Sequence, residues 1–192
     1  MTAAVFVDTN VFVYSRDSRD KSKQARAAAW LDQLWSERVG RTSMQVVSEY
    51  YWTVTRKLAA PYKAQEAWDH VIALLAWSPQ PIDDALIRRG REVEARHKLS
   101  WWDSLIIAAA ELQGCPLLLS EDLQDGGVYG SVTVRNPFTM SMNESLATYS
   151  PGSPAAHKHP ARGRPKKDPV KGRGGGLVEV VRNSPLHGLD PP

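Results

Sequence analysis

The chain has 192 residues and a formal net charge of +3, and its 42% hydrophobic and 23% charged residues are typical of a soluble globular protein. A single cysteine, Cys115, excludes an intrachain disulfide. No apolar run approaches the roughly 20 residues of a membrane span or forms the core of a signal peptide, so neither secretion nor membrane insertion is indicated and we expect a cytoplasmic protein.

Strand and helix patterns alternate from the start of the chain. Residues 3–7 are a short apolar run that ends at an aspartate, as a buried parallel strand does. Residues 22–35 carry alanine, leucine and tryptophan at helical spacing. Two further helices are expected over about 44–58 and 62–77, where serine and proline stop the second one.

The alternation continues to about residue 138. A helix opens at Asp83 or Asp84, and an alanine- and isoleucine-rich helix spans 101–113. Buried strands are expected over 116–119 and 131–134. Strands separated by helices predict an α/β fold in which helices cover both faces of a parallel sheet.

The C-terminal segment has a different composition. Residues 139–192 hold eight basic and four acidic residues, a balance of +4, whereas residues 1–138 hold 16 basic and 17 acidic residues, a balance of −1. Eight Pro and seven Gly in this segment disfavour a packed core. The sequence therefore predicts one domain over 1–138 and a basic, disordered tail over 139–192.

The tail contains one local motif, RGRPKK at 162–167. It resembles an AT-hook, a short arm that enters the narrow minor groove of A/T-rich DNA, and its candidate DNA contacts are Arg162, Arg164, Lys166 and Lys167. A solvated basic linker explains the same residues with fewer assumptions.

Four acidic residues of the body fall at positions that this fold would bring together. Asp8 ends the first strand and Asp122 follows the strand at 116–119, so the same edge of the sheet would present both. Glu49 lies on an otherwise apolar helix. Asp103 lies in the first turn of another apolar helix, where an unpaired charge is costly to bury. These four acids are candidates for one pocket.

Each acid also has a simpler interpretation. Asp8 and Asp122 are of a residue type that is common in turns and N-caps. Asp103 suits an N-cap because the start of a helix favours an anion, and Glu49 suits a solvated helix position. The joint occurrence of the four acids is what favours a shared site.

Four short motifs carry a family resemblance. They are VDTN at 7–10, SE at 48–49, WDS at 102–104 and SEDLQDG at 120–126. In order and spacing they resemble the motifs of PIN-domain ribonucleases, most of all the toxins of VapBC toxin–antitoxin systems. The resemblance covers residues 3 to about 138 and excludes the tail. It implies a PIN-like three-layer α/β/α fold with a short central parallel sheet.

The resemblance implies a metal-dependent endoribonuclease whose catalytic acids are Asp8, Glu49, Asp103 and Asp122. Asp8, Asp103, Asp122 and, as a further candidate, Asp125 would bind the metal. Mg²⁺, or Mn²⁺ in its place, suits such a set because hard divalent cations prefer oxygen ligands. A bound cation lowers the pKa of a water and stabilises the attacking and leaving oxygens of a phosphodiester.

Partners and supporting residues follow from the same resemblance. Thr9, Asn10 and Ser120 would hold carboxylates or phosphate oxygens by hydrogen bonds. RNA is the implied substrate, a cognate antitoxin would cover the acidic pocket, and a homodimer is expected. The alternative is a non-catalytic PIN-fold module that binds nucleic acid. A phosphatase of the haloacid-dehalogenase type is disfavoured because position 10 is Asn where that class needs a second Asp.

Overall fold

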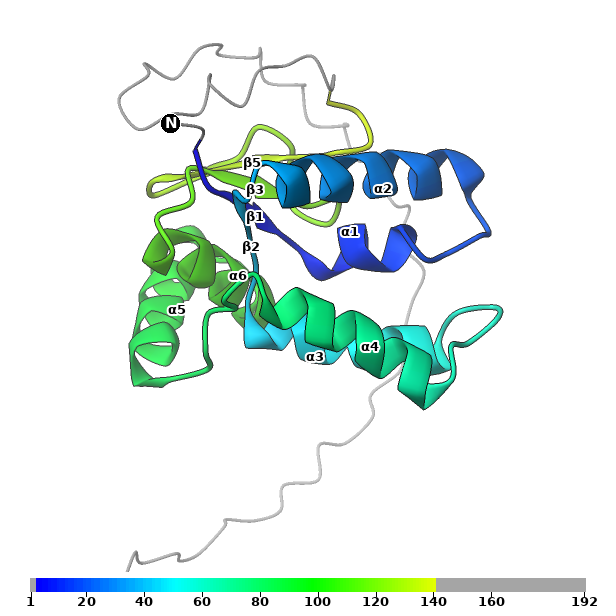
Figure 1. Cartoon of the computed structure of the whole chain (residues 1–192). Helices are drawn as coiled ribbons and strands as arrows, with labels where there is room; N and C mark the ends of the chain where they lie inside the picture. Colours follow the sequence, from blue (N-terminus) through cyan, green and yellow to red (C-terminus); the bar gives the residue numbers. More distant parts are fainter. Residues whose placement is uncertain (1–2, 141–192) are drawn as a thin grey trace, which may run out of the picture. The chain divides into compact units, whose positions relative to one another are not determined.

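The computed structural model describes residues 3–140, which form a five-stranded sheet with the order β2-β1-β3-β5-β4 (Figure 1). The strands are β1 (Val5–Val7), β2 (Gly40–Arg41), β3 (Leu117–Leu119), β4 (Val128–Tyr129) and β5 (Val132–Arg135). Four strands pair in parallel, and β4 pairs antiparallel to β5. The sequence predictions about the tail, including the AT-hook-like motif, fall outside the described residues.

Six helices connect these strands: α1 (Thr9–Tyr14), α2 (Lys21–Ser36), α3 (Met44–Arg56), α4 (Ala64–Leu75), α5 (Asp84–His97) and α6 (Trp101–Leu112). The chain leaves β1 toward β2 through α1 and α2, and returns from β2 to β3 on the other side of β1 through α3 to α6. Because parallel crossovers are right-handed, the two groups of helices cover opposite faces of the sheet. The predicted three-layer α/β/α fold is therefore confirmed.

Short polar residues begin several of the helices. The side chains of Asp20, Ser43, Asp83 and Ser100 each accept a hydrogen bond from the backbone N–H three residues later, at the starts of α2, α3, α5 and α6. These N-caps satisfy donors that have no partner inside the helix. They also fix the residue at which each helix starts, including α3, which carries Glu49, and α6, which carries Asp103.

The core is centred on β1 and β3, which are completely buried along their length. Burial on both faces explains why each strand is an uninterrupted apolar run. Helix α6 is also a central element, since all seven residues from Ser104 to Ala110 are buried. Asp103, immediately before this run, therefore stands where a core helix reaches the surface.

The structure differs from the sequence prediction in three short elements. Helix α1, strand β2 and strand β4 are six, two and two residues long, too short to give a periodic pattern. The predicted central parallel sheet is present, and a turn through Gly130, with a φ of +61°, adds β4 at its edge as an antiparallel partner of β5. Met140, the last described residue, is 1% exposed and is part of the hydrophobic core. No helix in residues 3–140 is long and apolar enough to cross a membrane.

Candidate active site

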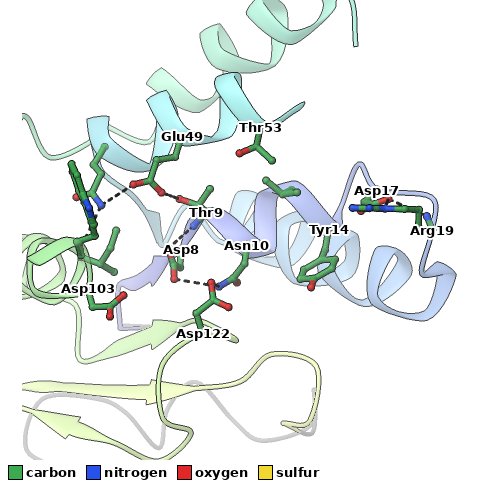
Figure 2. Close-up of a pocket in the computed structure, with 14 residues that line it drawn as sticks. Asp8, Thr9, Asn10, Tyr14, Asp17, Arg19, Glu49, Thr53, Asp103 and Asp122 are labelled. Carbon is green, nitrogen blue, oxygen red and sulfur yellow. Dashed lines mark hydrogen bonds and ion pairs between the residues drawn. The ribbon is translucent and has the colours of Figure 1, made fainter. Parts of the chain in front are cut away.

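A cleft of about 330 Å³ opens at the carboxyl ends of β1 and β3 (Figure 2). The four acids singled out in the sequence, Asp8, Glu49, Asp103 and Asp122, all line it. They come from the end of β1, from α3, from the first turn of α6 and from the loop after β3. Residues that are far apart in the sequence thus share one surface because the parallel strands end at the same edge of the sheet.

Asp8 is the most buried of the four acids, with 8% of its surface exposed. It is the N-cap of α1, and it accepts hydrogen bonds of 2.7 Å from the Thr9 backbone and 2.7 Å from the Ser120 hydroxyl. Burial raises the pKa of Asp8 from 3.8 to about 6; the two hydrogen bonds lower it in part, and the charges of Asp122 and Glu49 raise it. Asp8 therefore caps α1 and also lines the cleft, and a nearby cation would stabilise its charged form.

Asn10 lies between Asp8 and Asp122 and joins them. Its side-chain nitrogen is 3.1 Å from Asp122 Oδ2, 3.3 Å from Asp8 Oδ2 and 3.4 Å from the Ser120 hydroxyl. The Ser120 hydroxyl also accepts a hydrogen bond of 3.2 Å from the Asp122 backbone N–H. Asn10 and Ser120 thus hold two of the carboxylates in place by hydrogen bonds.

Glu49 is held at both of its carboxylate oxygens. Thr9 Oγ1 donates to Glu49 Oε2 at 2.8 Å, and Gln45 Nε2 donates to Glu49 Oε1 at 3.0 Å. Thr9 therefore contacts one of the four candidate acids. Gln45 was not predicted, although its position one helical turn before Glu49 is a signal that could have identified it.

Asp103 is held by the residue that caps its helix. The Ser100 hydroxyl accepts a hydrogen bond of 3.1 Å from the Asp103 backbone N–H and donates one of 2.8 Å to Asp103 Oδ2. The interpretation of Asp103 as an N-cap is therefore wrong, because Ser100 is the cap. The Asp103 carboxylate lies over the first turn of α6 and lines the cleft.

Asp125 lies apart from these acids and is not among the residues that line the cleft. Its carboxylate accepts hydrogen bonds from Arg135 Nε at 3.1 Å and from the Asn136 backbone N–H at 2.9 Å. Gly126, with a φ of +76°, turns the chain immediately afterwards. In this structure Asp125 therefore ties the loop after β3 to the end of β5.

One basic residue, Arg19, is found among the described residues that line the cleft. Its guanidinium binds the carboxylate of Asp17 through two nitrogens, at 2.9 Å from Nε and 2.6 Å from Nη2, and Figure 2 shows this pair to the right of the four acids. Asp17 is itself 5% exposed, and this ion pair lowers its pKa. The Arg19–Asp17 pair therefore adds no net charge to the cleft, and the negative charge of the cleft comes from the four predicted acids.

The donor set of the cleft fits a hydrated divalent cation. Among residues 3–140, no three His, Cys, Asp or Glu side chains form a ready-made metal site. Each of the four carboxylates accepts hydrogen bonds from neighbouring residues. All four acids nevertheless offer oxygen to one cleft, and Mg²⁺ keeps several of its waters when protein ligands are few. A cation held in part through water therefore suits this arrangement.

A comparison with family models matches residues 5–124 to the PIN domain. The chain belongs to the PIN-domain family. Two solved structures resemble this PIN domain: VapC20 of Mycobacterium tuberculosis, a toxin that cleaves the sarcin–ricin loop, and a toxin–antitoxin complex from Klebsiella pneumoniae. In a comparison with curated proteins, nothing matched the chain.

Both structural similarities are at 19% sequence identity and concern the fold alone. The TM-score with VapC20 is 0.46, over 60% of this chain and 87% of that chain. The TM-score with the Klebsiella structure is 0.50, over 70% of this chain and 98% of that chain.

Proposed function

We propose that this chain is a metal-dependent endoribonuclease and the toxin component of a type II toxin–antitoxin system. The observation that carries the proposal is the shared cleft: four carboxylates from four separate elements of a PIN domain line it. The toxin assignment rests on the motif resemblance to VapC toxins, and the fold shared with a protein of the Klebsiella toxin–antitoxin complex supports it.

A bound divalent cation, Mg²⁺ or Mn²⁺, would lower the pKa of a water and offset the charge that develops on the phosphate. Asp8, Asp103 and Asp122 hold the cation directly or through water. Glu49, fixed at both oxygens, orients the attacking water. That water loses one proton to solvent as its oxygen bonds to phosphorus, one P–O bond of the RNA backbone breaks, and the departing oxygen takes up a proton from solvent. Asp125, tied to the end of β5, is outside this set.

The proposed partners follow from the same site. RNA is the substrate, and a cognate antitoxin silences the enzyme by covering the acidic cleft. The active toxin is a homodimer in this proposal, as in the family that the motifs resemble. Binding of A/T-rich DNA by the tail is a separate proposal, which rests on the RGRPKK motif alone.

The test is cleavage of a mixed-sequence RNA by the full chain, with Mg²⁺ or Mn²⁺ and with EDTA. Asp8→Asn and Asp103→Asn each remove one carboxylate charge, and we expect the cleavage rate to fall on the order of 100-fold because the cation loses a ligand. Asp32→Asn, an exposed site on α2, is the matched control and should leave the rate unchanged. The products should lack a 2′,3′-cyclic phosphate, because water and not the ribose hydroxyl attacks.

Cleavage that persists in EDTA, or full activity in both cleft variants, would overturn the mechanism. RNA binding without cleavage under every metal condition would favour the non-catalytic binding module instead. Gel electrophoresis of end-labelled RNA distinguishes these outcomes in one experiment.

A further inference from the structure

Gln45 is a buried polar residue that belongs to the wall of the cleft. It lies in the first turn of α3, one helical turn before Glu49, and is 5% exposed. Its neighbours Val46 and Val47 are in the hydrophobic core, whereas Gln45 and Glu49 both line the cleft. Residues four apart on a helix share one side of it, so the Gln45 amide faces the Glu49 carboxylate.

The contacts of Gln45 fix the orientation of its amide group. Nε2 donates to Glu49 Oε1 at 3.0 Å and lies 3.5 Å from the Trp102 carbonyl oxygen. A carboxylate and a carbonyl only accept hydrogen bonds, so the amide must present its nitrogen to both. Trp102 directly precedes Asp103, and Gln45 therefore connects the helix that carries Glu49 with the first turn of the helix that carries Asp103.

This orientation leaves the amide oxygen without a partner. Gln45 Oε1 is buried, and no hydrogen-bond donor reaches it within the described part of the chain. An unpaired buried carbonyl is unfavourable for folding, because it loses its contact with water and gains nothing in return. An apolar side chain of similar length would avoid this cost, so the stability of the fold does not explain a glutamine at this position.

We propose that Gln45 is a positioning residue: it holds the Glu49 carboxylate in the cleft and links α3 to the Asp103 turn of α6. The neutral amide does this without offsetting the negative charge of Glu49, which an arginine or lysine in its place would do. Thr9 holds the other oxygen of Glu49, so the two contacts together prevent rotation of the carboxylate. This inference rests on the proposed function, because it concerns the same cation and reaction.

A second pair in the same chain provides a matched control. On α2, Gln33 Nε2 donates to Glu37 Oε1 at 2.9 Å, with the same spacing and chemistry, but this hydrogen bond is exposed to solvent. Neither residue lines the cleft. Replacing Gln33 therefore removes an equivalent helix contact without affecting the candidate active site.

The experiment compares Gln45→Met and Gln33→Met with wild type in the full-length chain. Methionine keeps the length of the side chain and removes both the donor and the unpaired oxygen. Three quantities are measured: Mn²⁺ affinity by isothermal titration calorimetry without RNA, kcat and KM for RNA cleavage, and the thermal unfolding midpoint. If Gln45 only supported the fold, its replacement would lower the unfolding midpoint.

For Gln45→Met we expect Mn²⁺ affinity or kcat to fall about 10- to 100-fold, as for other residues that orient metal ligands. KM for RNA should change less than about twofold, and the unfolding midpoint should stay the same or rise. Gln33→Met should match wild type in Mn²⁺ affinity and kcat.

A variant at position 45 with wild-type affinity and kcat, or with losses that accompany a lower unfolding midpoint, would overturn the positioning role. A wild-type chain that neither binds Mn²⁺ nor cleaves RNA would overturn the proposed function and this inference with it.

Discussion

Asp8 shows at the level of a single residue how function and stability compete in this molecule. As the N-cap of α1 it stabilises the helix, and its hydrogen bonds to Thr9 and Ser120 favour its charged form. Burial beside two other carboxylates works against that charge and raises its pKa to about 6. Without a cation, the folded chain therefore contains an ionised group that is more stable in the unfolded chain.

This conflict predicts that Asp8→Asn stabilises the metal-free protein. Asparagine keeps the capping oxygen and removes the charge. Because the pKa of Asp8 is raised on folding, its ionised form reduces stability fully above about pH 6, and this reduction disappears below the unfolded value of 3.8. At 1.36 kcal/mol per pKa unit, the gain in unfolding free energy at pH 8 is on the order of 1 to 3 kcal/mol.

Urea unfolding of wild type and Asp8→Asn in EDTA measures this difference at pH 8 and again at pH 4. The advantage of the variant should be present at pH 8 and nearly absent at pH 4. An equal difference at both pH values would show that the effect does not come from the charge of Asp8. A less stable variant at pH 8 would contradict the argument altogether.

At the level of elements, the start of α6 determines where Asp103 stands. Ser100 caps the helix and binds the Asp103 carboxylate with the same hydroxyl group. The following run from Ser104 to Ala110 is buried in the core, which fixes the axis of the helix. The position of Asp103 therefore depends on one cap and one packed helix, and only the cap can be removed without disrupting the core.

Ser100→Ala is expected to cost about 1 kcal/mol of stability through loss of the cap and also to lower RNA cleavage, because Asp103 loses its hydrogen-bond donor. Asp83→Ala is the matched control: Asp83 caps α5 in the same way, at 2.9 Å from the Leu86 backbone, and is not among the residues that line the cleft. Both variants should lose similar stability in urea unfolding, and only Ser100→Ala should lose cleavage at a temperature where both are folded. Equal cleavage by the two would exclude a role for Ser100 in the site.

At the level of the whole molecule, the sequence predicted the positions of those site residues that follow from the general geometry of a parallel sheet. Asp8 and Asp122 were placed in one pocket because parallel strands end at the same edge of a sheet. The Gln45–Glu49 spacing is visible in the sequence, but the contact of Gln45 with Trp102 depends on how α3 packs against α6, and the bond from Ser100 to the Asp103 carboxylate depends on a side-chain rotamer. Asp125 lies only three residues after Asp122, but its side chain binds Arg135 and not the residues of the cleft. The turn at Gly126 follows it directly, and closeness in sequence did not predict this arrangement.

The contacts of the last described residues, up to Met140, determine where the chain should be truncated to test the predicted tail. Met140 is 1% exposed, and Arg26 donates to the backbone carbonyls of Pro137 and Met140. Trp30 also donates to Pro137, at 3.2 Å. A chain that ends at residue 140 keeps all of these contacts, whereas a chain that ends at 138 loses Met140 and one contact of Arg26.

We therefore expect residues 1–140 to fold and cleave RNA as the full chain does, while residues 1–138 lose on the order of 2 kcal/mol, the contribution of one buried methionine. Binding of A/T-rich DNA should be absent from both, because the basic motif at 162–167 has been removed. Urea unfolding and a fluorescence anisotropy assay with A/T-rich and G/C-rich duplexes measure the two effects separately.

Equal stability of the two truncated chains would mean that Met140 is not part of the core. Unchanged DNA binding by residues 1–140 would assign any DNA contact to the body of the protein, and a loss of cleavage would give the tail a part in catalysis.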